Sequence, residues 1–77
     1  MEISTAGQGD TDIVSLKGRM EAVTAPEFEK TMSDLIEQGK RKYHVQLSDL
    51  EYVSSAGLRA VLIIVKRLRA EGGQIVF

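Results

Sequence analysis

Two adjacent serines, Ser54 and Ser55, are the residues whose type and position best suit chemistry in this sequence. They directly precede Ala56-Gly57-Leu58, where an apolar pattern of helical spacing begins. A hydroxyl group at or near a helix N-terminus meets free backbone N–H groups and the positive end of the helix dipole, and both favour an anion such as phosphate. The alternative is that the two serines only cap the helix, a common role for serine at such a position.

Other combinations of residues give no enzyme site. His44 and Ser55 could suggest nucleophilic catalysis, but His44 lies within a strand pattern and the sequence has no Gly-x-Ser-x-Gly motif. The glycines at 7, 9, 72 and 73 lack the sequence context of a phosphate-binding loop and are typical of turns. With one histidine and no cysteine, the chain has no conventional zinc site. We therefore expect no catalytic residue, no metal and no cofactor, and a protein that is not an enzyme.

Length and charge limit the function further. Seventy-seven residues predict a single domain, residues 1–77. The net charge of −1 argues against a nucleic-acid partner, which would require a basic surface. The longest apolar run, Ala60 to Val65, is far shorter than the roughly 18–20 residues that cross a bilayer, and the N-terminus does not resemble a signal peptide. The lack of cysteine suits a reducing compartment. These features predict a cytoplasmic protein without a membrane partner.

Hydrophobic spacing predicts six elements. Residues 11–17 form a strand with Ile13 and Leu16 inward, and residues 2–6 form its partner across a turn at 7–10. A helix spans about 25–38, where Thr24 and Glu27 would form a capping box and Pro26 is tolerated in the first turn. Its apolar positions are Phe28, Met32, Leu35 and Ile36.

The second half of the chain repeats this alternation. Residues 42–47 predict a strand with Tyr43, Val45 and Leu47 on one face, and residues 48–53 connect it to a helix at about 57–70. That helix carries an apolar stripe widened by Ile63 and Ile64, so we expect it to be covered on more than one side. The stripe consists of Leu58, Val61, Leu62, Val65 and Leu68, and Arg59, Lys66, Arg67 and Arg69 mark the solvent face. A last strand begins at Gln74. The predicted fold is α/β, in the order β-β-α-β-α-β, with helices packed on a mostly parallel or mixed sheet.

Two segments resemble the signatures of STAS-domain anti-sigma factor antagonists (anti-anti-sigma factors). Residues 18–26, Gly-Arg-Met-Glu-Ala-Val-Thr-Ala-Pro, resemble the family's Gly-x-Leu-Asp-x-x-Thr-Ala segment before its first helix. Residues 47–58, ending Ser-Ser-Ala-Gly-Leu, resemble the strand and loop that deliver Asp-Ser-Ser-Gly-Leu to the next helix. The two segments occur in the family's order and at its separation. The resemblance implies a small STAS domain, although the family's final helix, strand and helix have no counterpart in these residues.

The resemblance also implies a regulated site. When Gly57-Leu58 is aligned without a gap, the serine that the family phosphorylates falls at Ser55, with Ser54 as the second choice. The family aspartate before that serine is Ser54 here, and its aspartate after the first strand pair is Glu21. The implied partner-binding residues are Glu21, Ser54, Ser55, Ala56, Gly57, Leu58 and Arg59. Glu21 could equally be a solvated loop carboxylate.

A partner-switching function follows from the resemblance. The unphosphorylated protein would bind an anti-sigma factor that is also a serine kinase, and it would be released when that kinase uses ATP to phosphorylate Ser55. A metal-dependent serine phosphatase would reverse the modification. The alternative is a STAS scaffold or docking module that is not phosphorylated, which the replacement of the family aspartate by Ser54 keeps open.

Overall fold

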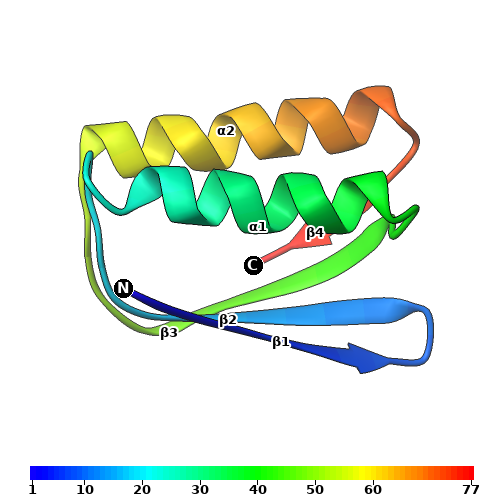
Figure 1. Ribbon diagram of the computed structural model, residues 1–77, viewed down its shortest axis with the longest axis horizontal. Coiled ribbons are helices and arrows are strands. Elements are labelled where there is room, and N and C mark those ends of the chain that lie inside the picture. The colour runs from blue at the N-terminus through cyan, green and yellow to red at the C-terminus, as the bar shows by residue number, and fades with distance from the viewer.

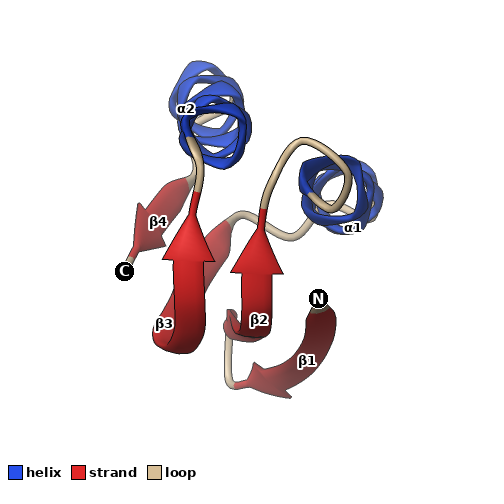
Figure 2. Cartoon of the chain, turned by 90° about the vertical axis from the view of Figure 1, so that its left-hand side faces the viewer, coloured by secondary structure: helices blue, strands red, loops and turns tan.

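The protein is a two-layer α/β domain, in which a four-stranded sheet carries two helices on one face (Figures 1 and 2). The structure is a computed structural model that describes residues 1–77. The elements in chain order are β1 (Glu2–Gln8), β2 (Thr11–Met20), α1 (Ala25–Glu37), β3 (Lys42–Val53), α2 (Ser55–Ala70) and β4 (Gln74–Val76). Neither helix is long and apolar enough to cross a membrane. The predicted element order and mixed sheet are confirmed.

The sheet order is β1-β2-β3-β4, so each strand pairs with its neighbour in the sequence. β1 and β2 are antiparallel and are joined by a two-residue turn, in which Gly9 has a φ of +65° that suits glycine. β2, β3 and β4 are parallel, because α1 and α2 return the chain to the same end of the sheet. The carboxyl ends of β2 and β3 therefore lie side by side.

The core lies between the sheet and the two helices. α1 contributes Phe28, Met32 and Ile36 and α2 contributes Ala60, Ile64 and Leu68, all at helical spacing and all essentially without solvent exposure. The strands supply the facing layer, which includes Val14, Leu16, Tyr43 and Val45. Burial raises the pKa of Tyr43 to about 12, and its hydroxyl group donates a hydrogen bond to the Lys40 carbonyl oxygen at 2.7 Å.

The side of strand β2 that faces the core is not the side that carries Ile13, which was predicted to point inward. Asp12, Val14 and Leu16 point into the core, whereas Ile13 is only partly buried. The polar residue on the buried face is accommodated because the Asp12 carboxylate pairs with the Lys40 ammonium group at 3.1 Å. The prediction that Ile13 is inward was therefore wrong, while that for Leu16 is confirmed.

Strand β3 and helix α2 are both longer than predicted. β3 continues through residues 48–53 because they pair with the end of β2, with register irregularities near Ser15–Lys17 and Gly18–Arg19. α2 begins at Ser55 rather than near Gly57. The strand thus runs almost directly into the helix, and Ser54 is the one residue between them.

α2 packs against α1 on one side and against β3 and β4 on another, as expected, but a third side remains open. Leu58, Leu62 and Ile63 are each about half exposed, at 55%, 49% and 50%. Leu58 and Val61 also line an apolar groove of about 330 Å³. The other residues that line it are Met20, Leu47, Leu50, Val53 and Phe77.

Candidate functional site at the ends of β2 and β3

The candidate site is a corner built from the ends of two parallel strands. Met20 and Val53 are register partners, and the Ser54 backbone N–H donates to the Met20 carbonyl oxygen at 2.9 Å. This bond holds the start of α2 against the start of the β2–α1 loop. The segment that carries Glu21 and the segment from Ser54 to Arg59 are therefore adjacent, as the parallel topology predicts.

The two serines have different environments. Ser54 is the N-cap of α2, with extended backbone angles, and its Oγ accepts a hydrogen bond from the Gly57 N–H at 3.2 Å. Its carbonyl oxygen accepts the Leu58 N–H at 2.9 Å. Ser55 is the first helical residue and is exposed, and its hydroxyl group has no hydrogen-bond partner within the protein. Ser54 thus satisfies the helix end, and the Ser55 hydroxyl group is free.

The β2–α1 loop is fixed by Thr24, although not in the way the sequence suggested. Thr24 precedes α1 but makes no side-chain capping bond, so the predicted capping box with Glu27 is absent. The Thr24 Oγ1 instead accepts from the Glu21 N–H at 2.9 Å and donates to the Arg19 carbonyl oxygen at 2.8 Å. The hydroxyl group therefore ties the loop to itself and sets the position of Glu21.

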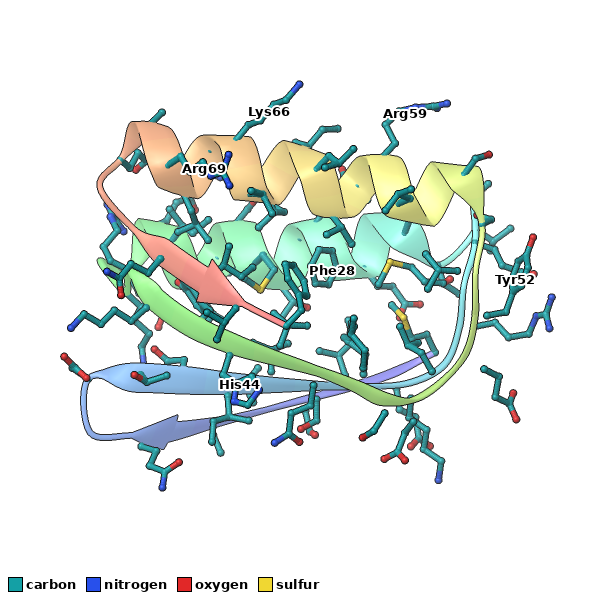
Figure 3. The ribbon with its side chains drawn as sticks, turned by 180° about the vertical axis from the view of Figure 1, so that it is seen from behind. Phe28, His44, Tyr52, Arg59, Lys66 and Arg69 are labelled. Atoms are coloured by element: carbon teal, nitrogen blue, oxygen red, sulfur yellow. The ribbon has the colours of Figure 1, made fainter.

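Glu21 is part of a surface cluster that sequence reasoning missed. Its carboxylate accepts two hydrogen bonds from the Arg19 guanidinium group, at 2.8 and 3.0 Å. The same guanidinium group lies 4.5 Å from the centre of the Tyr52 ring, a cation–π contact, and Figure 3 places Tyr52 at this corner. Arg19 and Tyr52 are register partners on β2 and β3, and only the extension of β3 past Leu47 could have indicated their contact.

The remaining predicted residues also lie at the corner. Ala56 is partly buried, Gly57 is buried, and Leu58 and Arg59 are exposed. His44 does not lie there, because it is near the start of β3 and Ser55 follows the end of that strand (Figure 3). The structure therefore separates the His44–Ser55 pair that could have suggested catalysis.

Gly57 is the residue that sets how closely α2 approaches β2. A Cβ atom at this position would lie 2.6 Å from the Met20 carbonyl oxygen and 3.0 Å from Met20 Cγ, so backbone would have to move. We expect Gly57→Ala to lower the free energy of unfolding by about 1–2 kcal/mol, because overpacking outweighs the gain in helix propensity. Urea unfolding would measure this, with Ala56→Gly as a control for helix propensity alone. A stability for Gly57→Ala equal to or above that of the parent would contradict the close approach.

The basic run Lys40-Arg41-Lys42 lies at the end of the sheet opposite the candidate site, and each of its three cations forms an ion pair with a carboxylate. Lys40 pairs with Asp12 at 3.1 Å, and Lys42 pairs with Asp10 at 2.8 Å, which lowers the pKa of Asp10. Arg41 pairs with Glu71 at 3.2 Å and also donates to the Ile36 carbonyl oxygen. The Arg41–Glu71 pair joins the two connections after the helices, and the two lysine pairs join the connection after α1 to the β1–β2 hairpin.

Comparison with known proteins identifies the family. The family described as "Mlab, STAS domain" matches residues 3–77, which is nearly the whole chain. The chain therefore belongs to the STAS-domain family, as the two sequence segments suggested. It is also similar to BtrV of Bordetella bronchiseptica, named as an anti-sigma factor antagonist, with 36% identity over 64 residues. That match covers 83% of this chain and 55% of BtrV, so the chain spans about half the length of this relative.

Solved structures share the fold at lower sequence identity. The anti-sigma factor antagonist SpoIIAA in its unphosphorylated form matches with a TM-score of 0.80, at 20% identity over 96% of this chain and 69% of that one. The phosphorylated form of SpoIIAA, from Bacillus, matches with a TM-score of 0.81 at 19% identity, over 99% and 70% of the two chains. A protein called Mglu matches with a TM-score of 0.84 at 24% identity over 94% of this chain, but over only 18% of its own. The same fold thus also occurs as a small part of a larger protein.

Proposed function

We propose that this protein is an anti-sigma factor antagonist controlled by phosphorylation of Ser55. Residues 1–77 would act as one STAS domain in the cytoplasm. In the unphosphorylated state the corner formed by Glu21 and residues 54–59 would bind an anti-sigma factor that is also a serine kinase. The similarity to BtrV and the shared fold with SpoIIAA support the class of partner.

The observation that carries the proposal is the division of roles between Ser54 and Ser55. Ser54 is engaged in capping α2, whereas Ser55 is exposed and its hydroxyl group makes no hydrogen bond. Modification of Ser55 would leave the cap intact. A phosphate adds about −1.5 to −2 charge at pH 7, at a helix end where negative charge is mildly stabilising. The modification would therefore change the surface of the corner without unfolding the domain.

The same charge would weaken a partner contact. An anion that is desolvated in an interface costs free energy unless the partner supplies a counter-charge, so a partner that fits the unphosphorylated corner would be released. The kinase would supply ATP, and a metal-dependent serine phosphatase would restore the neutral state. In this scheme all catalysis belongs to the partners, and the protein itself is a binding switch.

A second candidate is a STAS scaffold or docking module that is not phosphorylated. It is supported by Ser54, which stands where the family's aspartate would lie beside the acceptor serine. The occurrence of the fold as a small part of Mglu also suits a module within an assembly.

Displacement of a client separates the two candidates. A candidate anti-sigma factor kinase from the same organism would be purified as a complex with its sigma factor, and the unphosphorylated protein would be added in excess. We expect release of the sigma factor, measured by size-exclusion chromatography, and no release by protein already phosphorylated by the kinase. Binding to the kinase without release of its client would favour the scaffold.

A further inference from the structure

The outward face of α2 carries a row of residues that begins at the proposed phosphorylation site. Residues four, seven, eleven and fourteen positions after Ser55 lie on one side of a helix with 3.6 residues per turn. These residues are Arg59, Leu62, Lys66 and Arg69, and all are exposed. We call Ser55 and these four residues the α2 row. Figure 3 shows Arg59 and Lys66 pointing away from the sheet, with Arg69 further along the same helix.

The cations of the α2 row are not compensated within the protein. The chain has ten lysine and arginine residues, and six of them form ion pairs. Of the four without an ion pair, three are Arg59, Lys66 and Arg69, and the fourth is Lys17 on β2. α2 itself contains no acidic residue, so no neighbour on the helix neutralises the row. This concentration of free positive charge contrasts with the net charge of −1 of the whole chain.

Half-exposed aliphatic side chains accompany these cations. Leu62 lies within the α2 row and is 49% exposed, and Ile63 beside it is 50% exposed. Large apolar residues interspersed with cations on one helix face match a partner that combines apolar side chains with carboxylates. We infer that the α2 row is a docking surface for an acidic amphipathic segment of a partner protein.

A protein segment fits this face better than an anionic membrane does. α1 lies beside α2 on the same side of the sheet (Figure 2) and carries Glu27, Glu29, Asp34 and Glu37 against a single lysine. A flat anionic bilayer resting on α2 would also meet these carboxylates and be repelled. A narrow segment that lies along α2 alone avoids them and still meets the three cations.

The row also connects docking with the proposed switch. A phosphate on Ser55 would lie four residues before Arg59, which is the favourable orientation for an ion pair between an acidic and a basic group on a helix. The phosphate would therefore form an ion pair with Arg59, the cation nearest to the corner, and its negative charge would repel the carboxylates of an acidic partner. This inference rests on the proposed function for the identity of the partner, but the docking chemistry can be tested without any kinase.

The test uses a synthetic peptide of three heptads, with leucines on one face and glutamates beside them. Its affinity would be measured by fluorescence anisotropy at low salt for the parent protein, for Arg59→Glu/Lys66→Glu, and for Lys17→Glu/Lys30→Glu. The last pair makes the same change in net charge away from α2. We expect the α2 pair to weaken binding at least tenfold and the control pair to weaken it less than twofold. Amide NMR spectra of each variant would establish that it is folded and would map the peptide on the parent.

Three results would overturn the inference. The first is equal weakening by both pairs of substitutions, and the second is peptide-induced shifts confined to the groove lined by Leu47 and Phe77. The third is no measurable peptide binding alongside binding to vesicles of phosphatidylserine and phosphatidylcholine, which would assign the row to a membrane. Since no kinase or ATP is present, none of these results bears on phosphorylation of Ser55. Conversely, a finding that the kinase does not phosphorylate Ser55 would leave the peptide result unchanged.

Discussion

Ser55→Ala is expected to abolish the gain in mass that the parent protein shows after incubation with its kinase and ATP. The parent should gain the mass of one phosphate, and the variant should gain none, because Ser55 is the exposed serine with a free hydroxyl group at the corner. Intact-protein mass spectrometry measures this directly. The effect is all-or-none and does not depend on a small difference in affinity.

Ser54→Ala is the matched control for that experiment. It removes the hydrogen bond from the Gly57 N–H, so it should lower the free energy of unfolding by about 1 kcal/mol. For a domain of this size, such a loss lowers the melting temperature by about 4–8 °C, and the assay should be run well below the transition. The variant should still be phosphorylated, at a rate no higher than that of the parent. Undiminished phosphorylation of Ser55→Ala, or a phosphate mapped to Ser54, would show that the alignment is shifted by one residue.

The sequence predicted the fold where local signals agreed with tertiary packing. α1 was found within one residue because Pro26 favours its first turn and Phe28, Met32 and Ile36 follow at helical spacing. The order of elements was enough to predict the parallel neighbours, because helices connect them. These features depend on short-range spacing, which a single sequence displays directly.

The failures have a common physical cause, which is that tertiary contacts overrode local patterns. Residues 48–53 contain Asp49 and Glu51, residue types that are depleted in strands, yet pairing with β2 makes them a strand. The buried face of β2 includes Asp12, which only a distant partner, Lys40, makes tolerable. Thr24 has the residue type of a helix cap, but the Arg19 carbonyl oxygen and the Glu21 N–H engage its side chain instead. None of these partners is visible from spacing alone.

The candidate site was predicted more completely than its surroundings. The resemblance to the family selected Glu21 and residues 54–59, and the structure brings these two segments together through the Ser54–Met20 hydrogen bond. The resemblance did not select Arg19 and Tyr52, because their contact depends on the register of β2 against β3. The division of roles between the two serines also required the structure, because either residue could have been the cap.

Ser55→Asp should bind the partner kinase at least tenfold more weakly than the parent, which corresponds to about 1.4 kcal/mol or more. The carboxylate introduces negative charge where the proposed phosphate would lie, and a partner that fits the unphosphorylated corner would have to desolvate it. Ser55→Asn is the matched control, because asparagine has nearly the same shape without the charge. It should bind within about threefold of the parent, which corresponds to less than about 1 kcal/mol.

Negative charge at Ser55 is proposed to release the partner while the domain stays folded, and one paired measurement tests this switch. Kinase affinity by isothermal titration calorimetry and the folding midpoint would be determined on the same preparations of the parent, Ser55→Asp and Ser55→Asn. We predict a tenfold or greater loss of affinity for Ser55→Asp alone. Its folding midpoint should lie within a degree or two of the parent, because an acidic residue in the first turn of α2 is mildly stabilising. Binding of a folded Ser55→Asp as tight as that of the parent would contradict the claim and favour the scaffold.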